Sequence, residues 1–289
     1  MTVLFTDTDT DFTPVEAARY GYRLISMPYC VNDEVIYPYE SFDVFDSKAF
    51  YDSLRKGTLP TTSALSPEAY KRYFEPVFAA GDDIFYVHFS AAMTATFASM
   101  DQALAELKEK YPERKFWQVD TKGITICSYN IVKEIGEMFV AGKTPEEIIA
   151  WADVEVDKFA TYFYADNLTF FRKSGRVSGL TAAMGNMIGI RPIITMNSEG
   201  KMVNVGKARG RENAIAALLA KVDELGENLK DHTIVVGQSD AREVAERIIA
   251  ELREKYGEDL RIDLVTVNPT AGSHCGPDGV GICFHAVHR

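Results

Sequence analysis

The chain has 289 residues, of which 46% are hydrophobic and 25% are charged, and its formal net charge is −11. That length is enough for one large or two medium domains, and the negative charge disfavours nucleic acid and anionic membrane surfaces as partners. No run reaches the ~18 apolar residues of a transmembrane helix. The N-terminus lacks the basic start of a signal peptide, and the four cysteines form no CxxC or zinc spacing. We therefore expect a cytoplasmic protein with free thiols.

The first half of the chain alternates strand-like and helix-like segments. We expect strands at residues 3–5, 24–31, 83–89 and 116–119. Helices are expected at residues 14–20, 48–56, 67–80, 97–111, 128–141 and 145–158. This alternation is typical of an α/β unit with a mostly parallel sheet.

The second half differs in character. It begins with an aromatic, strand-like run at residues 160–171, a basic turn at 172–179 and a short helix at 180–188. Further strands are expected at residues 189–196, 202–207, 232–236, 261–267 and 280–287, with helices at 209–225 and 240–256. We place a domain boundary near residue 158. The expected architecture is two α/β domains, an N-terminal one of residues 1–158 and a C-terminal one of residues 159–289.

A glycine-rich stretch at residues 268–279 is the clearest candidate for a binding loop. It joins two expected strands, and its glycines and prolines allow the backbone to turn sharply or to approach a ligand. Ser273 and His274 lie in its middle. The alternative is an ordinary surface turn with an uninvolved histidine.

Hydroxyl residues supply the other candidates. Thr62 and Ser63 precede a helix that Ser66 can cap, so they are surplus to capping, although they could simply form a turn. Ser90 follows the strand at residues 83–89, at the carboxyl end where ligands bind in doubly wound sheets. Arg176 and Arg191 in the second half are further candidates. A site between two domains would bring these residues together.

Asp7, Asp9 and Asp11 alternate with threonines after the first strand. The spacing does not match an EF-hand, because no glycine or closing glutamate follows at the required positions. We expect these acids to cap a helix and face solvent, with a cation site as the alternative.

Six segments resemble the corresponding segments of the DegV family, the bacterial fatty-acid-binding proteins. They are LFTDT (4–8), TSALSP (62–67), SAAMTAT (90–96), GR (175–176), GIRPI (189–193) and GSHCGP (272–277). In the family these segments read D-S-T/S after the opening strand, T-S-Q-P-S-P, S-x-x-L-S-G-T, G-R, N-I-K-P-I and G-S-H-T-G-P-G. They occur in the family's order and cover nearly the whole chain.

The resemblance implies a long-chain fatty acid buried in a tunnel between the two domains. Its carboxyl group would be held by Thr62, Ser90 and His274, with Ser63, Ser273 and Arg176 as further ligand-binding candidates. In one branch of the family the protein presents the acid to a separate fatty acid kinase, which makes acyl-phosphate for phospholipid synthesis. The implied role is therefore that of a carrier, not an enzyme, with no cofactor and no metal. Residues expected to line the tunnel are Phe89, Met93, Phe163, Met184, Met187 and Ile282.

The alternative is a hydrolase of acyl esters or acyl-phosphates, with Ser90 as nucleophile and His274 as base. Ser90 does not lie in a G-x-S-x-G elbow, and no acid is placed by the sequence to orient His274. The two functions differ in one observable, because a carrier retains lipid without turning it over.

Overall fold

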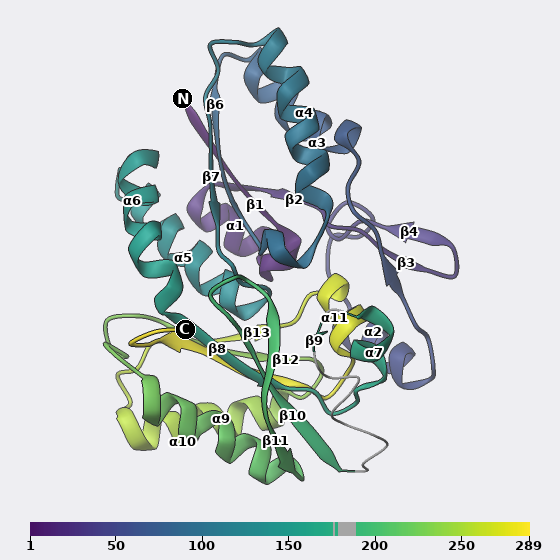
Figure 1. Ribbon diagram of the computed structural model, residues 1–289, viewed down its shortest axis with the longest axis vertical. Helices are drawn as coiled ribbons and strands as arrows, with labels where there is room; N and C mark the ends of the chain where they lie inside the picture. The colour runs from purple at the N-terminus through teal and green to yellow at the C-terminus, as the bar shows by residue number, and fades with distance from the viewer. Residues whose placement is uncertain (176, 179–188) are drawn as a thin grey trace.

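The computed structural model describes residues 1–175, 177–178 and 189–289. Its N-terminal half is built on a four-stranded sheet in the order β2-β1-β6-β7 (Figure 1). Every neighbouring pair in this sheet is parallel, as the sequence predicts. The strands are β1 (Thr2–Asp7), β2 (Tyr22–Ile25), β6 (Asp83–His88) and β7 (Phe116–Asp120).

Helices cover both faces of this sheet, which explains why its strands are apolar on both sides. Successive residues of a strand point to opposite faces: Leu4 packs with α1, α5 and α6, whereas Phe5 packs with α3 and α4. Local capping signals fix the helix starts, as in the capping box that Thr13 and Glu16 form at α1. The helices are α1 (Pro14–Tyr20), α3 (Pro67–Ala79), α4 (Thr96–Lys110), α5 (Ile126–Val140) and α6 (Pro145–Glu155).

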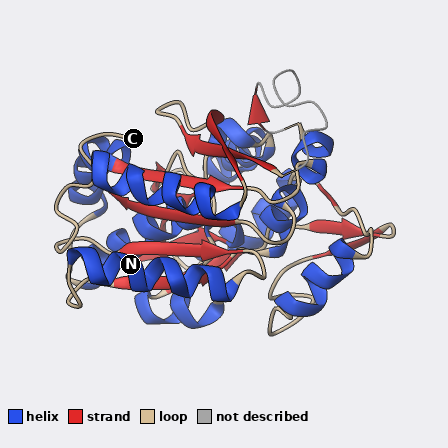
Figure 2. Ribbon diagram, turned by 90° about the horizontal axis from the view of Figure 1, so that it is seen from below, coloured by secondary structure: helices blue, strands red, loops and turns tan. Residues whose placement is uncertain are grey.

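The C-terminal half forms a seven-stranded mixed sheet in the order β13-β12-β14-β8-β10-β11-β9. Its strands are β8 (Phe159–Tyr164), β9 (Val177–Ser178), β10 (Ile190–Met196), β11 (Met202–Arg209), β12 (Ile234–Gln238), β13 (Ile262–Thr266) and β14 (Val280–His285). Helices α9 (Arg211–Leu225) and α10 (Arg242–Tyr256) pack on one face, and Figure 2 shows the strands and helices stacked in layers. The predicted boundary near residue 158 falls just before β8 and stays a prediction.

A smaller unit projects from the N-terminal half (Figure 1). It contains a three-stranded sheet of β3 (Tyr29–Val31), β4 (Glu34–Ile36) and β5 (Thr61–Thr62), together with α2 (Ser47–Arg55). Arg55 ties it to the C-terminal half through ion pairs with Asp240 and Asp278, and the Tyr51 hydroxyl donates to the Val267 carbonyl (2.8 Å). The unit therefore closes over the junction of the two halves.

Three sequence predictions need correction. The strand expected at residues 24–31 is two strands, β2 and β3. The run at 160–171 ends as a strand at Tyr164 and continues as helix α7 (Thr169–Ser174), which Gly175 terminates with φ 66°. The stretch expected to be a loop contains helix α11 (Pro269–Cys275), because Asn268 is an N-cap and Pro269 occupies the first helical position. The helix expected at 180–188 lies outside the described residues.

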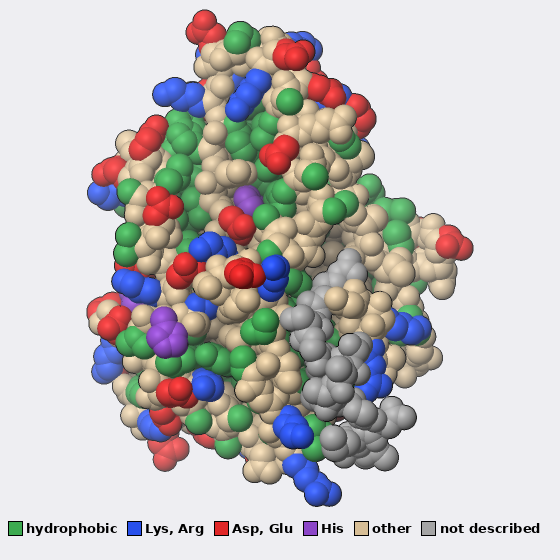
Figure 3. Space-filling view, in the orientation of Figure 1, with side chains coloured by type: hydrophobic (Ala, Val, Ile, Leu, Met, Phe, Trp, Pro, Cys, Tyr) green, Lys and Arg blue, Asp and Glu red, His purple; other side chains and the backbone are tan. Residues whose placement is uncertain are grey.

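Short 3-10 turns complete the fold: η1 (Thr8–Thr10), η2 (Ala91–Met93) and η3 (Val156–Lys158). Acidic and basic side chains are interspersed over the face shown in Figure 3. Within the described ranges, no helix combines the length and the apolar character that crossing a membrane requires.

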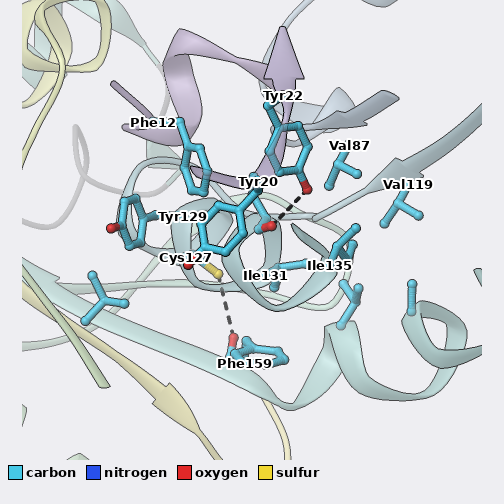
Figure 4. Close-up of a cluster of buried hydrophobic side chains, with 14 of the residues drawn as sticks. Phe12, Tyr20, Tyr22, Val87, Val119, Cys127, Tyr129, Ile131, Ile135 and Phe159 are labelled. Carbon is cyan, nitrogen blue, oxygen red and sulfur yellow. Dashed lines mark hydrogen bonds between the residues drawn. The ribbon is translucent and has the colours of Figure 1, made fainter. Parts of the chain in front are cut away.

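Helix α5 is shared by the two halves. Its side chains from Ile126 to Val132 are all buried, and the apolar ones among them join one cluster with residues of both sheets, including Val87 from β6 and Val235 from β12. Figure 4 shows this cluster, in which the Cys127 thiol lies 3.7 Å from the Phe159 carbonyl oxygen at the start of β8. The two sheets are therefore held together by a common core, and a cavity lies beside the first turn of α5.

Candidate functional site

A cavity of ≈ 230 Å³ is lined by residues of both halves. Its wall includes residues of β5, η2 and α5 from the N-terminal half and of β8, β12, β14 and α11 from the C-terminal half. Most of the wall is apolar. The apolar residues that line it are Met27, Ala64, Phe89, Met93, Ala95, Ile124, Ile126, Phe163, Phe171, Met202, Val267, Ala271, Cys275 and Val280.

Three of the residues expected to line a tunnel lie in this wall: Phe89, Met93 and Phe163. Ile282 does not, and the expectation was wrong. In β14, Gly281 faces the cavity, so the next residue points to the opposite face and Ile282 is buried beneath α9 and α10. Met184 and Met187 lie outside the described residues.

The cavity has a polar point where Thr62 meets His274. The Thr62 hydroxyl oxygen and His274 Nε2 are 2.9 Å apart, and both residues are partly exposed. Thr62 is held on β5, which pairs with β3 next to Tyr29. Ser63 follows in the wall of the same cavity. Two of the three residues implied as carboxyl anchors, Thr62 and His274, are therefore in direct contact.

Helix α11 is fixed firmly at the end opposite His274. The Asn268 side chain accepts a hydrogen bond from the Ala271 amide (2.9 Å), and the Asn268 amide and side chain both donate to Asp11 Oδ1 (2.8 and 2.7 Å). The Thr270 hydroxyl donates to the Met27 carbonyl (2.8 Å). These contacts set the position from which α11 carries His274 to the cavity.

Ser90 and Ser273 are buried, and neither lines the cavity. The Ser90 hydroxyl donates to the Gly200 carbonyl (2.7 Å), and the Ser273 hydroxyl donates to the Pro269 carbonyl one helical turn earlier (2.8 Å). The structure therefore does not bring these two hydroxyls together with Thr62 and His274.

Thr94, four residues after Ser90 in the same segment, lies in the wall instead. Sequence reasoning missed it, together with Thr96, Thr125, Ser239 and Thr270, and it assigned Asp9, which also lines the wall, to a helix cap or a cation site. The signal for Thr94 was available, because it is the second hydroxyl residue of a segment already singled out. Which of the two hydroxyls, that of Ser90 or that of Thr94, reaches the cavity depends on the backbone conformation of η2.

The geometry does not favour a hydrolase built on Ser90. A serine nucleophile needs its hydroxyl within hydrogen-bond reach of its base. The Ser90 hydroxyl is instead directed at the Gly200 carbonyl, whereas His274 Nε2 meets Thr62.

The three N-terminal aspartates are buried, so the expectation that they face solvent was wrong. Asp7 accepts hydrogen bonds from the Asp9 amide, the Phe89 amide and the Tyr86 hydroxyl (3.0, 3.2 and 3.0 Å). Burial raises the pKa of Asp7 to about 7, against these hydrogen bonds, and likewise the pKa of Asp11 to about 7. The same effect raises the pKa of Asp9 well above its ordinary value. Across the described ranges, no group of three or more His, Cys, Asp or Glu side chains could hold a metal ion.

Of the two remaining candidates, Arg176 lies outside the described residues. Arg191, its neighbour in the family resemblance, is engaged elsewhere: its guanidinium donates to Asp166 (2.8 Å from Nε) at the end of β8. Arg191 is therefore held in an ion pair rather than directed into the cavity wall.

The family model described as "uncharacterised protein, DegV family" matches residues 1–287. A DegV domain-containing protein of Clostridium perfringens is 30% identical over 283 residues, which cover 98% of this chain and 96% of the relative. A DegV domain-containing protein of Lactococcus lactis is 24% identical over 281 residues, covering 96% of each chain.

Several solved structures with the same fold are of proteins described with a fatty acid or by their fatty acid binding. A DegV family protein from Ruminococcus gnavus, described with vaccenic acid, has a TM-score of 0.85 at 20% identity and covers 98% of this chain and 99% of its own. One from Eubacterium eligens, loaded with heptadecanoic acid, has a TM-score of 0.84 at 21% identity and covers 99% and 100%. A third, from Thermus thermophilus and described by its fatty acid binding, has a TM-score of 0.84 at 22% identity, with 99% of both chains covered. At these identities the likeness establishes the fold.

Proposed function

The chain belongs to the DegV family, and we propose that it binds a long-chain fatty acid in its cavity, with the carboxyl group held by Thr62 and His274. The observation that carries this proposal is the form of the cavity. A mainly apolar wall built by both halves leads to one point where a hydroxyl and an imidazole meet at 2.9 Å. Structures of the same fold from Ruminococcus gnavus and Eubacterium eligens, described with fatty acids, support the same ligand class.

Burial of the acyl chain supplies the affinity. Each methylene removed from water contributes about 0.8 kcal/mol, so a sixteen-carbon tail gains roughly 10 kcal/mol before entropic costs. Met27, Met93 and Met202 in the wall suit a bent chain, because the unbranched thioether fills irregular gaps.

The carboxyl group needs partners wherever it leaves bulk water. The Thr62 hydroxyl can donate to a carboxylate, and the His274 ring can donate from a nitrogen or supply a positive charge. Both residues are partly exposed, and Thr61 and Ser63 beside them are exposed. The acid would therefore bury its tail while its carboxyl group stays within reach of a second protein.

That accessibility supports a carrier role. We propose that the protein presents the carboxylate to a separate fatty acid kinase. There a carboxylate oxygen attacks the γ-phosphorus of ATP, the bond to ADP breaks, and acyl-phosphate forms for phospholipid synthesis. The chain itself supplies binding and orientation, and the kinase supplies the ATP site. A cytoplasmic location suits an ATP-dependent partner and four cysteines that are free in the structure.

Two measurements test the two parts of this proposal. Native mass spectrometry of freshly purified protein, followed by lipid extraction, should show a bound species of fatty-acid mass that is released on denaturation. A mass that stays that of the bare chain after stearate and palmitate are added contradicts fatty acid binding.

The carrier role is tested by adding a fatty acid kinase and ATP and measuring acyl-phosphate. Whether Arg176 contacts the fatty acid is still a prediction. The alternative is that Arg176 contacts the kinase. If Arg176 contacts the kinase, Arg176→Glu should keep the parent affinity for stearate and lower acyl-phosphate formation. Equal loss of both indicates instead that Arg176 holds the ligand. Failure of the unaltered protein to support any acyl-phosphate formation contradicts the carrier role while leaving lipid binding in place.

A further inference from the structure

Asp9 places a carboxyl group in the wall of the fatty-acid cavity. The residue is 6% exposed, and its Oδ1 atom has no hydrogen-bond partner among the described residues. Its backbone is fixed on both sides: the Asp9 amide donates to Asp7 Oδ1 (3.0 Å), and the Asp9 carbonyl accepts from the Thr125 amide (2.9 Å). A buried polar atom without a partner costs free energy, so its presence in a cavity wall calls for a partner on the ligand.

The neighbouring aspartates differ from Asp9 in their position, because neither lines the cavity, although Asp11 Oδ2 also lacks a hydrogen-bond partner among the described residues. Asp7 accepts three hydrogen bonds within the protein, and Asp11 accepts two from Asn268. These two acids stabilise the turn at η1 and the start of α11. The Asp9 carboxyl carries no such bond at Oδ1 and borders the space that the ligand occupies.

The chemistry of the Asp9 carboxyl follows from its surroundings. Burial is the largest effect on its pKa, and the nearby charges of Asp7 and Asp11 act in the same direction, so the pKa lies well above the ordinary value. In the protonated form the group offers one O–H donor and one carbonyl acceptor. An alcohol has the matching acceptor and donor on a single oxygen. Thr125, which also lines the cavity, adds a hydroxyl residue beside it.

The distance from the carboxyl anchor decides which part of the ligand meets Asp9. The segment that carries Asp9 is bonded through Asp11 to Asn268, at the start of α11, whereas His274 lies in the last turn of that helix. At 1.5 Å per residue, Asn268 and His274 are about 9 Å apart along the helix axis. Asp9 lies two residues before Asp11, so we expect a fatty acid anchored at Thr62 and His274 to meet Asp9 with carbons of its tail and not with its carboxyl group.

We propose that the cavity takes a fatty acid with a hydroxyl group on its acyl chain, and that Asp9 is the residue that hydrogen-bonds this hydroxyl. The proposal rests on the fatty-acid-binding function above and narrows its substrate class. A site that hydrogen-bonds a ligand hydroxyl disfavours the analogue without it, because the buried protein group is then left unpaired.

Calorimetric titration of the delipidated protein with stearate, and with hydroxystearates substituted at successive chain positions, tests this directly. At least one positional isomer should bind about tenfold more tightly than stearate. In Asp9→Leu that preference should disappear or reverse, whereas Asp9→Asn, which keeps a neutral donor and acceptor, should retain most of it. Met27→Leu, an apolar exchange in the same wall, should change the affinities for both ligands alike.

The comparison in the unaltered protein requires no variant, so a folding defect in Asp9→Leu does not remove the test. Equal or tighter binding of stearate than of every hydroxystearate overturns the proposal, as does an unchanged preference in folded Asp9→Leu. Failure of stearate and all hydroxystearates to bind is a different result, because it overturns the fatty-acid-binding function itself and this proposal with it.

Discussion

The Thr62 hydroxyl oxygen lies 2.9 Å from His274 Nε2, although the two residues are 212 positions apart in the chain. Thr62 is carried by β5 of the small sheet, and His274 is carried by α11 of the C-terminal half. The contact therefore exists only when the projecting unit is closed against the second half. The proposed carboxyl anchor would therefore be a product of the junction and not of either half alone.

Removing either partner of this contact should weaken fatty acid binding. Thr62→Val and His274→Ala each leave a carboxylate oxygen without a hydrogen bond, which costs about 1–3 kcal/mol, or roughly 5- to 150-fold in Kd. Calorimetric titration with stearate measures the effect. Thr61→Val is the matched control, because Thr61 is exposed and does not line the cavity. Parent-like affinity in both Thr62→Val and His274→Ala contradicts the assignment.

The N-cap of α11 should matter for binding as well as for stability. Asn268→Ala removes the cap and the side-chain hydrogen bond to Asp11 but keeps the backbone one, so α11 loses two of the contacts that set the position of His274. A lost N-cap costs about 1 kcal/mol of unfolding free energy. Ser66→Ala removes the N-cap of α3, which accepts from the Ala69 amide (3.2 Å), and serves as the control.

Urea denaturation and stearate titration separate the two effects of these caps. Both variants should lose stability, Asn268→Ala the more because it also loses the side-chain hydrogen bond to Asp11, but only Asn268→Ala should raise the Kd for stearate. A similar rise in Kd for Ser66→Ala would show that the loss of affinity follows general destabilisation.

Filling the cavity should exclude part of the acyl chain. Met93 lies in the wall on η2, and Met93→Trp places a larger ring in the space. Each displaced methylene costs about 0.8 kcal/mol, or about fourfold in Kd, so stearate should bind at least about tenfold more weakly. Decanoate, which needs less of the cavity, should lose less. Ala92 is the exposed neighbour of Met93 and does not line the cavity, so Ala92→Trp should leave both affinities unchanged. Equal losses of affinity for stearate and decanoate in Met93→Trp would argue against a site for the acyl tail.

Burial of Asp9 predicts a specific dependence of stability on pH. Because the pKa of Asp9 is raised on folding, the folded chain binds more protons than the unfolded chain above about pH 4, and stability falls as the pH rises. Asp9→Asn removes this contribution. In lipid-free protein, the unfolding free energy of Asp9→Asn should rise relative to that of the parent as the pH increases. The rise should be up to about 1.4 kcal/mol per pH unit between the unfolded-state and folded-state pKa values of Asp9.

Urea denaturation of the parent and of Asp9→Asn from pH 4 to pH 8 measures this difference. Asp7 and Asp11, with pKa values of about 7, contribute to both proteins and cancel in the comparison. Curves of unfolding free energy that run parallel across this range would show that Asp9 does not carry a raised pKa.

Local signals made much of the fold predictable from the sequence. Thr144 and Pro145 mark a helix start by capping geometry alone, and α6 begins at Pro145 as expected. Helix α11 was missed because its glycines suggest a loop, although Asn268 and Pro269 form a recognisable helix start. The capping signal was therefore the more reliable guide at this site.

The site was only partly predictable, because its geometry depends on contacts between distant segments. Thr62 and His274 were named from the family resemblance, but the sequence gives no reason for their contact. Ser90 and Thr94 could not be ranked, since which hydroxyl reaches the cavity depends on the backbone of η2 and on the Gly200 carbonyl. The burial of Asp9 was hidden for a similar reason, because it depends on the packing of η1 against α5, more than a hundred residues later in the chain.

The most direct test of the carboxyl anchor is the carbon NMR spectrum of palmitate labelled with ¹³C at its carboxyl carbon, bound to the delipidated protein. The account predicts one bound resonance, shifted from that of free palmitate. This resonance should move in His274→Ala and in Thr62→Val and should keep its position in Thr61→Val. A bound resonance at the same position in all four proteins would contradict an anchor built from Thr62 and His274.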